Sequence, residues 1–199
     1  MNNHFRPPDL SKTTQAAEGL QRRRWSLAEI EAMVKAGILP EDDRFELIGG
    51  EVVPMSPKGN RHELVKGALN RYWTKKLRDG VCLVPETTLR INNDTFYEPD
   101  FVFYLESDGL VNLSPETVRF AVEVADTSLD YDLHRKVQLY AVYGIREVWV
   151  IDANKLVTHV HRRPSTEGYG EVLQITADQE IAPLFAPEFA VKMAELKLI

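Results

Sequence analysis

A glutamate inside an apolar strand pattern constrains this chain more than any other feature. Residues 119–125 read RFAVEVA, and the alternation of side chains along a strand places Glu123 on a face otherwise formed by Ala121 and Ala125. Both faces of the run are otherwise apolar, which is typical of a central strand covered by helices on each side. Because an isolated buried carboxylate is costly, Glu123 must be paired, protonated or bound to a cation.

A second acid stands at the start of another strand pattern. Asp100 opens the apolar run 101–104 directly after Pro99, a residue that marks a strand start because it cannot donate a ladder hydrogen bond. An aspartate at a strand end, beside a glutamate on a neighbouring strand, brings together oxygen ligands of the kind that Mg2+ or Mn2+ prefers. We therefore predict a metal site formed by Asp100, Glu123 and the carbonyl of Val124.

A helix pattern supplies the positive charge. Apolar residues recur at helical spacing over 130–143, and Gly144 is placed as the C-terminal stop. Asp132, Lys136 and Tyr140 are four residues apart, so they share one side of this helix. If the helix packs on the strands, the Lys136 ammonium lies near Glu123, where it can orient a water and neutralise charge on a phosphate oxygen.

The order of these residues resembles the restriction-endonuclease-like superfamily with its PD-(D/E)XK motif. The surrounding sequence is more closely similar to the Uma-type restriction endonuclease family. The matching segments are FELIGGE at 45–51, His62, Pro99-Asp100, Glu123-Val124-Ala125 and the run from Lys136 to Asp152. In the superfamily motif the lysine stands two residues after the glutamate, a position held here by Ala125. The resemblance to the Uma-type family implies that Lys136 replaces it.

The resemblance implies an α/β fold of restriction-endonuclease-like type: a mixed sheet flanked by helices, with an N-terminal helix and hairpin. We expect a flexible arm over 1–21, which is polar and aperiodic, and a single nuclease domain over 22–199. The implied activity is metal-dependent hydrolysis of phosphodiester bonds in DNA with Mg2+ or Mn2+ as cofactor. The implied catalytic residues are Asp100, Glu123, Lys136 and His62.

Composition and net charge limit the kinds of partner and the compartment that we expect for this chain. The chain has 199 residues, 44% of them hydrophobic and 27% charged, which fits one globular domain. A net charge of -6 is not typical of a broadly basic nucleic-acid-binding surface, so DNA contact must rely on a local basic patch or a bridging metal. The lone Cys82 excludes an internal disulfide and no apolar run could span a membrane, which predicts a cytoplasmic protein. A homodimer is compatible with cutting both strands of a duplex.

The run 60–78 predicts an amphipathic helix in which Glu63 is a capping residue. His62, in its first turn, is either a water-positioning base or substrate contact, or a histidine that is hydrogen-bonded locally. We expect the basic polar face of the helix to be either solvated or, beside a metal site, the place for a phosphate backbone. That face carries Lys66, Arg71, Lys75, Lys76 and Arg78.

Three further patterns give expectations. The run 81–91 predicts one long strand, bent at Pro85. In the hairpin 44–55, which turns at residues 49–50, Glu46 either points toward the site or, as is more usual, is a surface glutamate. His159 and His161 share a face of the strand pattern 155–162, a spacing seen in metal sites, but the expected edge position favours a solvated pair.

A competing hypothesis is a nuclease fold without catalysis that serves as a binding or assembly module. Glu123 and Lys136 would then form a buried ion pair, and Asp100 would cap a strand without metal. A nucleotide-binding α/β enzyme is disfavoured, because no glycine-rich phosphate loop follows any strand pattern.

Overall fold

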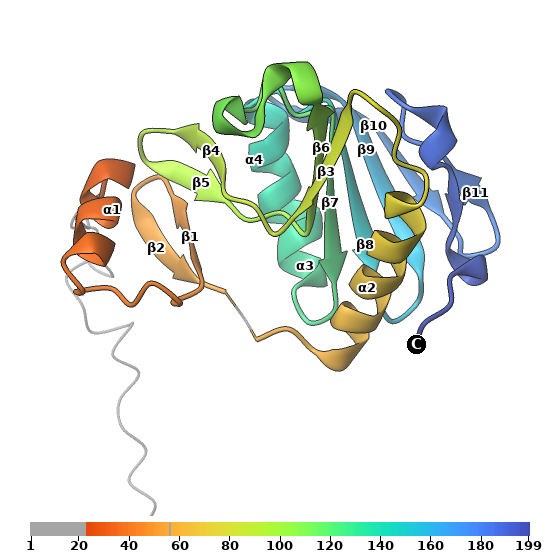
Figure 1. Cartoon of the computed structure of the whole chain (residues 1–199), viewed down its shortest axis with the longest axis horizontal. Helices are drawn as coiled ribbons and strands as arrows, with labels where there is room; N and C mark the ends of the chain where they lie inside the picture. Colours follow the sequence, from red (N-terminus) through yellow and green to blue (C-terminus); the bar gives the residue numbers. More distant parts are fainter. Residues whose placement is uncertain (1–22, 56) are drawn as a thin grey trace, which may run out of the picture.

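The main feature of the computed structural model, which describes residues 23–55 and 57–199, is a six-stranded mixed sheet (Figure 1). Its strand order is β10-β9-β8-β7-β6-β3, in which only β7 and β8 run parallel. The strands are β3 (Val81–Pro85), β6 (Phe101–Leu105), β7 (Phe120–Ala125), β8 (Glu147–Asp152), β9 (Val157–Ser165) and β10 (Gly168–Ile175). The predicted arm over 1–21 lies outside the described residues.

Both faces of β7 are covered, as its sequence predicts. All six residues of the strand are buried. Phe120, Val122 and Val124 face a core that includes the apolar side of α2 (Asn60–Thr74) and the C-terminal segment. Ala121 and Ala125 face a second core that includes α4 (Val137–Val142), so helices lie on opposite sides of the sheet (Figure 1). The α/β class with a mixed sheet is confirmed.

Trp73 fixes α2 on the sheet. Its fully buried ring meets Phe101 and Phe103 edge-on, with centroids 5.5 and 5.4 Å away, and its indole N–H donates to the Phe189 carbonyl at 3.0 Å. At the other end of the helix, a Cβ on Gly59 would collide with the Asp126 carboxylate. The first turn of α2 is therefore held against the loop that follows β7.

A second sheet lies beside the main one and is covered by α1 (Leu27–Lys35) (Figure 1). It has the antiparallel order β2-β1-β5-β4. Its strands are β1 (Phe45–Ile48), β2 (Glu51–Pro54), β4 (Leu89–Asn92) and β5 (Thr95–Tyr97). Ile30 of α1 packs on Leu47 and Phe96, and the predicted capping box of Ser26 and Glu29 begins the helix. The expected N-terminal helix and hairpin are both present.

The prediction of one long strand over 81–91 is wrong. The segment forms β3 in the main sheet and β4 in the second sheet. Between them Glu86 adopts a positive φ of 50°, which is uncommon for a residue other than glycine and turns the chain out of the main sheet.

Two predicted helices differ in detail from those observed. The helix expected over 60–78 ends at Thr74, and its N-cap is Gly59, with no side-chain capping bond, so Glu63 is not the capping residue. The helix expected over 130–143 consists of α3 (Leu129–Tyr131), the π-helical η5 (Asp132–Lys136) and α4. It ends just before Gly144, which has a positive φ of 80°.

The expectation of a solvated histidine pair is wrong for His161. Strand β9 is not at the edge of the sheet, because β10 pairs along its outer side. His161 is only 6% exposed, and burial, together with the neighbouring His159, lowers its pKa to about 4. Its imidazole is therefore neutral at neutral pH.

None of the helices in the described ranges is long and apolar enough to cross a membrane.

Short elements complete the fold. The short elements are η3 (Glu106–Asp108), η4 (Leu110–Asn112), η6 (Pro187–Phe189), η7 (Met193–Glu195) and the pair β11 (Glu180–Ile181) and β12 (Val191–Lys192).

Candidate active site

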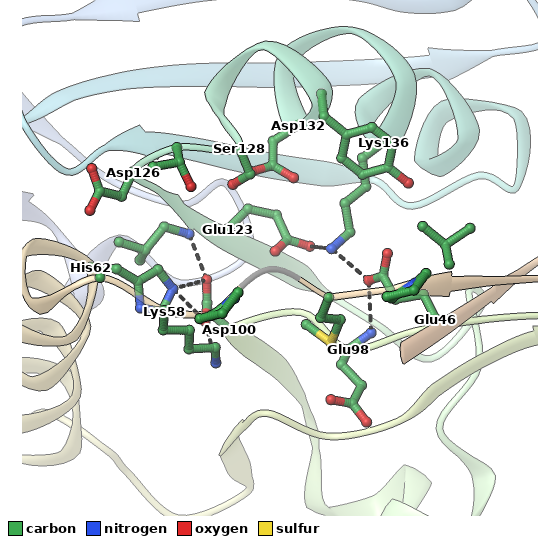
Figure 2. Close-up of a pocket in the computed structure, with 18 residues that line it drawn as sticks. Glu46, Lys58, His62, Glu98, Asp100, Glu123, Asp126, Ser128, Asp132 and Lys136 are labelled. Atoms are coloured by element: carbon green, nitrogen blue, oxygen red, sulfur yellow. Dashed lines mark hydrogen bonds and ion pairs between the residues drawn. The ribbon is translucent and has the colours of Figure 1, made fainter. Parts of the chain in front are cut away.

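The carboxyl end of β7 opens into a cavity of about 380 Å³. Its walls come from both sheets, from the start of α2 and from the π-helical turn η5. Asp100 and Glu123 lie in the middle of the close-up, between the side chains of His62 and Lys136 (Figure 2). The structure thus brings all four predicted catalytic residues to one cavity.

Strand register places the two predicted metal-binding carboxylates next to one another. Phe101 of β6 pairs with Val122 of β7 in an antiparallel ladder, and one further step along that register sets Asp100 opposite Glu123. Both residues are buried, each with 5% of its surface exposed.

Asp100 is held by donors from three directions. Its Oδ2 accepts the Val124 N–H at 2.8 Å, the His62 Nε2 lies 3.0 Å away, and the Lys58 ammonium is 3.3 Å from Oδ1. Burial alone would raise the pKa of this carboxyl. The hydrogen bond and charge of His62, the Lys58 charge and the Val124 N–H outweigh burial and lower the pKa below its usual range, so Asp100 is ionised.

The bond from Val124 also orients the third predicted ligand. The N–H and C=O groups of one residue point to the same edge of a strand. Since the Val124 N–H faces Asp100, its carbonyl faces the same side, whereas the Ala125 carbonyl accepts from Ala153 on the β8 side at 2.8 Å. The Val124 carbonyl is therefore directed toward the edge of β7 on which Asp100 lies.

Glu123 lacks sufficient positive charge around it. Its Oε1 accepts the Tyr140 hydroxyl at 2.6 Å and lies 3.0 Å from the Lys136 ammonium. Burial, which Lys136 offsets only in part, raises the pKa of this carboxyl to about 8, and Asp132 and Asp100 add to the rise. The Glu123 carboxyl is therefore much easier to protonate than an ordinary glutamate, and an additional cation beside it would favour its ionised form.

Lys136 lies between two acids. Its Nζ is 2.7 Å from Glu46 Oε1 and 3.0 Å from Glu123 Oε1. Burial disfavours the ammonium, but the charges of Glu123, Glu46 and Asp132 outweigh it and raise the pKa of Lys136 well above its usual value. The side chain is therefore a buried cation.

A π-helical turn places this lysine. The Val137 N–H donates to the Asp132 carbonyl, five residues earlier, so the turn that carries both Asp132 and Lys136 is wider than in an α-helix. Both side chains are buried and line the cavity. Asp132 is fixed by the Ser128 hydroxyl at 2.6 Å. Such turns often occur at functional sites.

Glu46 points toward the site, which is the less usual of the two alternatives that the sequence left open. It is 4% exposed, and its Oε1 accepts the Glu98 N–H at 3.3 Å in addition to the Lys136 contact. The hairpin sequence contains a signal for this position. Glu46 lies on the same face of the strand as Ile48, which packs against the second core, whereas Leu47 lies on the opposite face and packs beneath α1. An acid on the same face as a core isoleucine is a candidate for burial.

His62 and the basic face of α2 have specific partners. His62 contacts Asp100 through Nε2 and Glu63 through Nδ1 at 3.1 Å, so it combines the local bond and the site contact that the sequence left open. Of the basic face, Arg71, Lys76 and Arg78 bind the C-terminal segment. Lys66 of this face instead contacts Glu86, which also pairs with Arg44 and with Lys58, a residue that lines the cavity.

No group of three or more His, Cys, Asp or Glu side chains in the described ranges is arranged to hold a metal ion. The predicted ligands at the end of β7 are instead two carboxylates, Asp100 and Glu123, and the carbonyl of Val124. Metal binding here would require water or substrate to complete the coordination, as is common for Mg2+.

Residues 27–194 match a protein family described as "Uma2: Putative restriction endonuclease". The chain belongs to the Uma2 family. Among solved structures it is similar to the crystal structure of "a putative nuclease belonging to DUF820" from Anabaena variabilis, with a TM-score of 0.65 and 17% identity over 85% of this chain and 96% of that one. No curated protein matches. At this identity the structural match shows a shared fold.

Membership in Uma2 confirms the resemblance inferred from the sequence, and it suggests a nuclease of restriction-endonuclease type. The departure at Ala125 has a structural reason in this chain. Ala125 is fully buried and faces the second core, whereas Lys136 reaches Glu123 from the following helical segment.

We predict that Glu123→Gln stabilises the metal-free protein above pH 5. In the folded wild type the Glu123 pKa is near 8, against 4.5 in the unfolded chain, so between these values folding takes up a proton and stability falls as pH rises. The expected slope is about 1 kcal/mol per pH unit. Gln keeps an acceptor for Tyr140 and Lys136 and has no charge to bury. Urea unfolding at pH 5 to 8 in a chelator measures this, and a large loss of stability in the variant at pH 7 would show that the charge is a structural requirement.

Proposed function

We propose that this Uma2 protein is a metal-dependent endonuclease that hydrolyses phosphodiester bonds of DNA. Asp100, Glu123 and the Val124 carbonyl would hold Mg2+ or Mn2+. The observation that supports the proposal best is that the two carboxylates line one cavity, with the Lys136 ammonium 3.0 Å from Glu123. These are the groups that metal-assisted hydrolysis requires: oxygen ligands, a cation for the developing charge and space for substrate.

The donor set fits a hard divalent cation. Carboxylate and carbonyl oxygens are the preferred ligands of Mg2+ and Mn2+. The contacts of Glu123 with Tyr140 and Lys136 both use Oε1, and no hydrogen bond to Oε2 is made by the described residues. Burial, with the charges of Asp132, Asp100 and Glu46, raises the pKa of Glu123, and the positive charge of a divalent ion at this carboxylate would offset that rise. When bound, the ion would lower the pKa of a water ligand and shield the phosphate.

The surrounding side chains have distinct roles in this proposal. Lys136 orients the attacking water and stabilises negative charge on the phosphate oxygen. Glu46 and Tyr140 hold Lys136 and Glu123 in place, through contacts of 2.7 and 2.6 Å respectively. His62 acts on Asp100, because its Nε2 is directed at that carboxylate.

One observation favours the alternative of a nuclease fold that acts only as a binding or assembly module. Each carboxylate already has a cationic partner without metal: Lys136 at Glu123 and Lys58 at Asp100. Such pairs can be purely structural. Metal binding and DNA cleavage separate the two functions.

We expect the wild-type protein to bind Mn2+ in calorimetry and to nick supercoiled plasmid only when Mg2+ or Mn2+ is present. Asp100→Asn, which keeps the side-chain shape but removes the charge, should abolish Mn2+ binding and reduce nicking roughly 100-fold or more. Asp108→Asn is the control, because Asp108 does not line the cavity and pairs with Arg119 at 3.1 Å. A wild type that neither binds Mn2+ nor nicks DNA would support the module instead.

Glu46→Gln should lower kcat about 10- to 100-fold while leaving the Mn2+ affinity within a few-fold of wild type, since Glu46 holds Lys136 and is not a metal ligand in this account. Steady-state nicking kinetics and calorimetry on the same preparation give the two values. Glu46→Asp should recover part of the rate if reach to Lys136 is what matters. Equal losses of kcat and folded fraction, with normal turnover per folded molecule, would instead assign Glu46 to stability alone.

A further inference from the structure

Three cationic side chains converge on Glu86 at the edge of the cavity. Lys66 of α2 contacts Glu86 Oε1 at 2.9 Å, Arg44 contacts it at 3.4 Å, and the Lys58 ammonium contacts the same oxygen. These residues come from separate segments of the chain: α2, the residue before β1, and the residue before the N-cap of α2. Their convergence on a single oxygen is produced by the fold.

This cluster adjoins the proposed metal ligands. Lys58 lines the cavity and contacts both Glu86 and Asp100 Oδ1, the latter at 3.3 Å. The Glu86 N–H donates to the Asp100 carbonyl at 3.2 Å. Arg44 also contacts Glu98, another residue of the cavity wall. A group bound at the cluster would therefore lie next to a phosphodiester positioned at Asp100 and Glu123.

Glu86 has properties of a replaceable partner. Its side chain is 37% exposed, whereas those of Lys58 and Lys66 are only 16% and 12% exposed. Burial would raise the pKa of Glu86, but Lys58 and Lys66 outweigh it and lower the pKa to about 2, so the carboxylate is ionised. Its exposed side lets an external anion approach the same lysines and compete with it. A phosphate group offers several acceptor oxygens to three donors, where Glu86 offers one oxygen to all of them.

We propose that Lys58, Lys66 and Arg44 form a binding site for a backbone phosphate beside the cleaved bond, and that Glu86 occupies this site when no substrate is bound. The chemical class of the ligand is a phosphate group; that it belongs to DNA rests on the proposed function. The site supplies the local basic patch that a chain of net charge -6 needs for nucleic-acid contact.

Glu63 and Glu98 also contact members of the cluster: Glu63 is 2.9 Å from Lys66 and Glu98 is 3.6 Å from Arg44. A purely structural network of surface ion pairs would use the same contacts. The two explanations predict different effects of one substitution, Glu86→Gln. Removing the Glu86 charge should weaken a structural network but should free a phosphate site.

The first test measures binding of a labelled DNA duplex by fluorescence anisotropy, in chelator and at several salt concentrations. Glu86→Gln should tighten binding several-fold. Lys66→Met should weaken binding several-fold and reduce the slope of log affinity against log salt by about 0.9, the value for one phosphate contact. Lys75→Met, at the far end of α2, is the control and should match wild type. If Glu86→Gln binds no tighter than wild type and Lys66→Met matches the control, the phosphate site is refuted.

The second test uses inorganic phosphate and does not depend on nuclease activity. Phosphate should raise the melting temperature of Glu86→Gln more than that of wild type, and the double variant Glu86→Gln/Lys66→Met should lose this gain. A wild type that neither binds nor nicks DNA, combined with this phosphate response, would overturn the proposed function and leave the anion site standing. Absence of the response in a folded Glu86→Gln protein would overturn the site even if DNA is nicked.

Discussion

The burial of Glu123 in the central strand β7 is the constraint on which the rest of the site depends. A carboxylate among Ala121, Ala125 and the second core cannot remain ionised without a cation, and the Lys136 ammonium satisfies this need only in part. The remaining deficit of positive charge is what makes the end of β7 a candidate metal site.

Three structural elements place the side chains that surround Glu123. The β6–β7 register brings Asp100 beside Glu123, and the π-helical turn of η5 delivers Lys136 from above the sheet (Figure 2). The second sheet contributes Glu46, which contacts Lys136 at 2.7 Å. The site is thus shared between two sheets, and its geometry depends on how the hairpin of β1 and β2 packs against the main body.

The sequence predicted those parts of the fold that follow from local pattern. Alternation identified β7 as a covered central strand, and spacing along the following helical segment set Lys136 on the side of Tyr140, both of which contact Glu123. The sequence could not predict the break at Glu86, because its positive φ depends on tertiary contacts rather than on residue type. The burial of His161 was missed, and Glu46 could not be assigned to the site or to the surface, for a related reason: each position depends on which strand or helix packs against it.

The most direct test of the account is the position of Mn2+ in crystals, located by its anomalous scattering. The account predicts one ion about 2.1 Å from oxygens of Asp100, Glu123 and the Val124 carbonyl, with Lys136 still in contact with Glu46. A map without an ion at the end of β7, in crystals soaked at saturating Mn2+ and with the Glu123 and Lys136 pair unchanged, would contradict it.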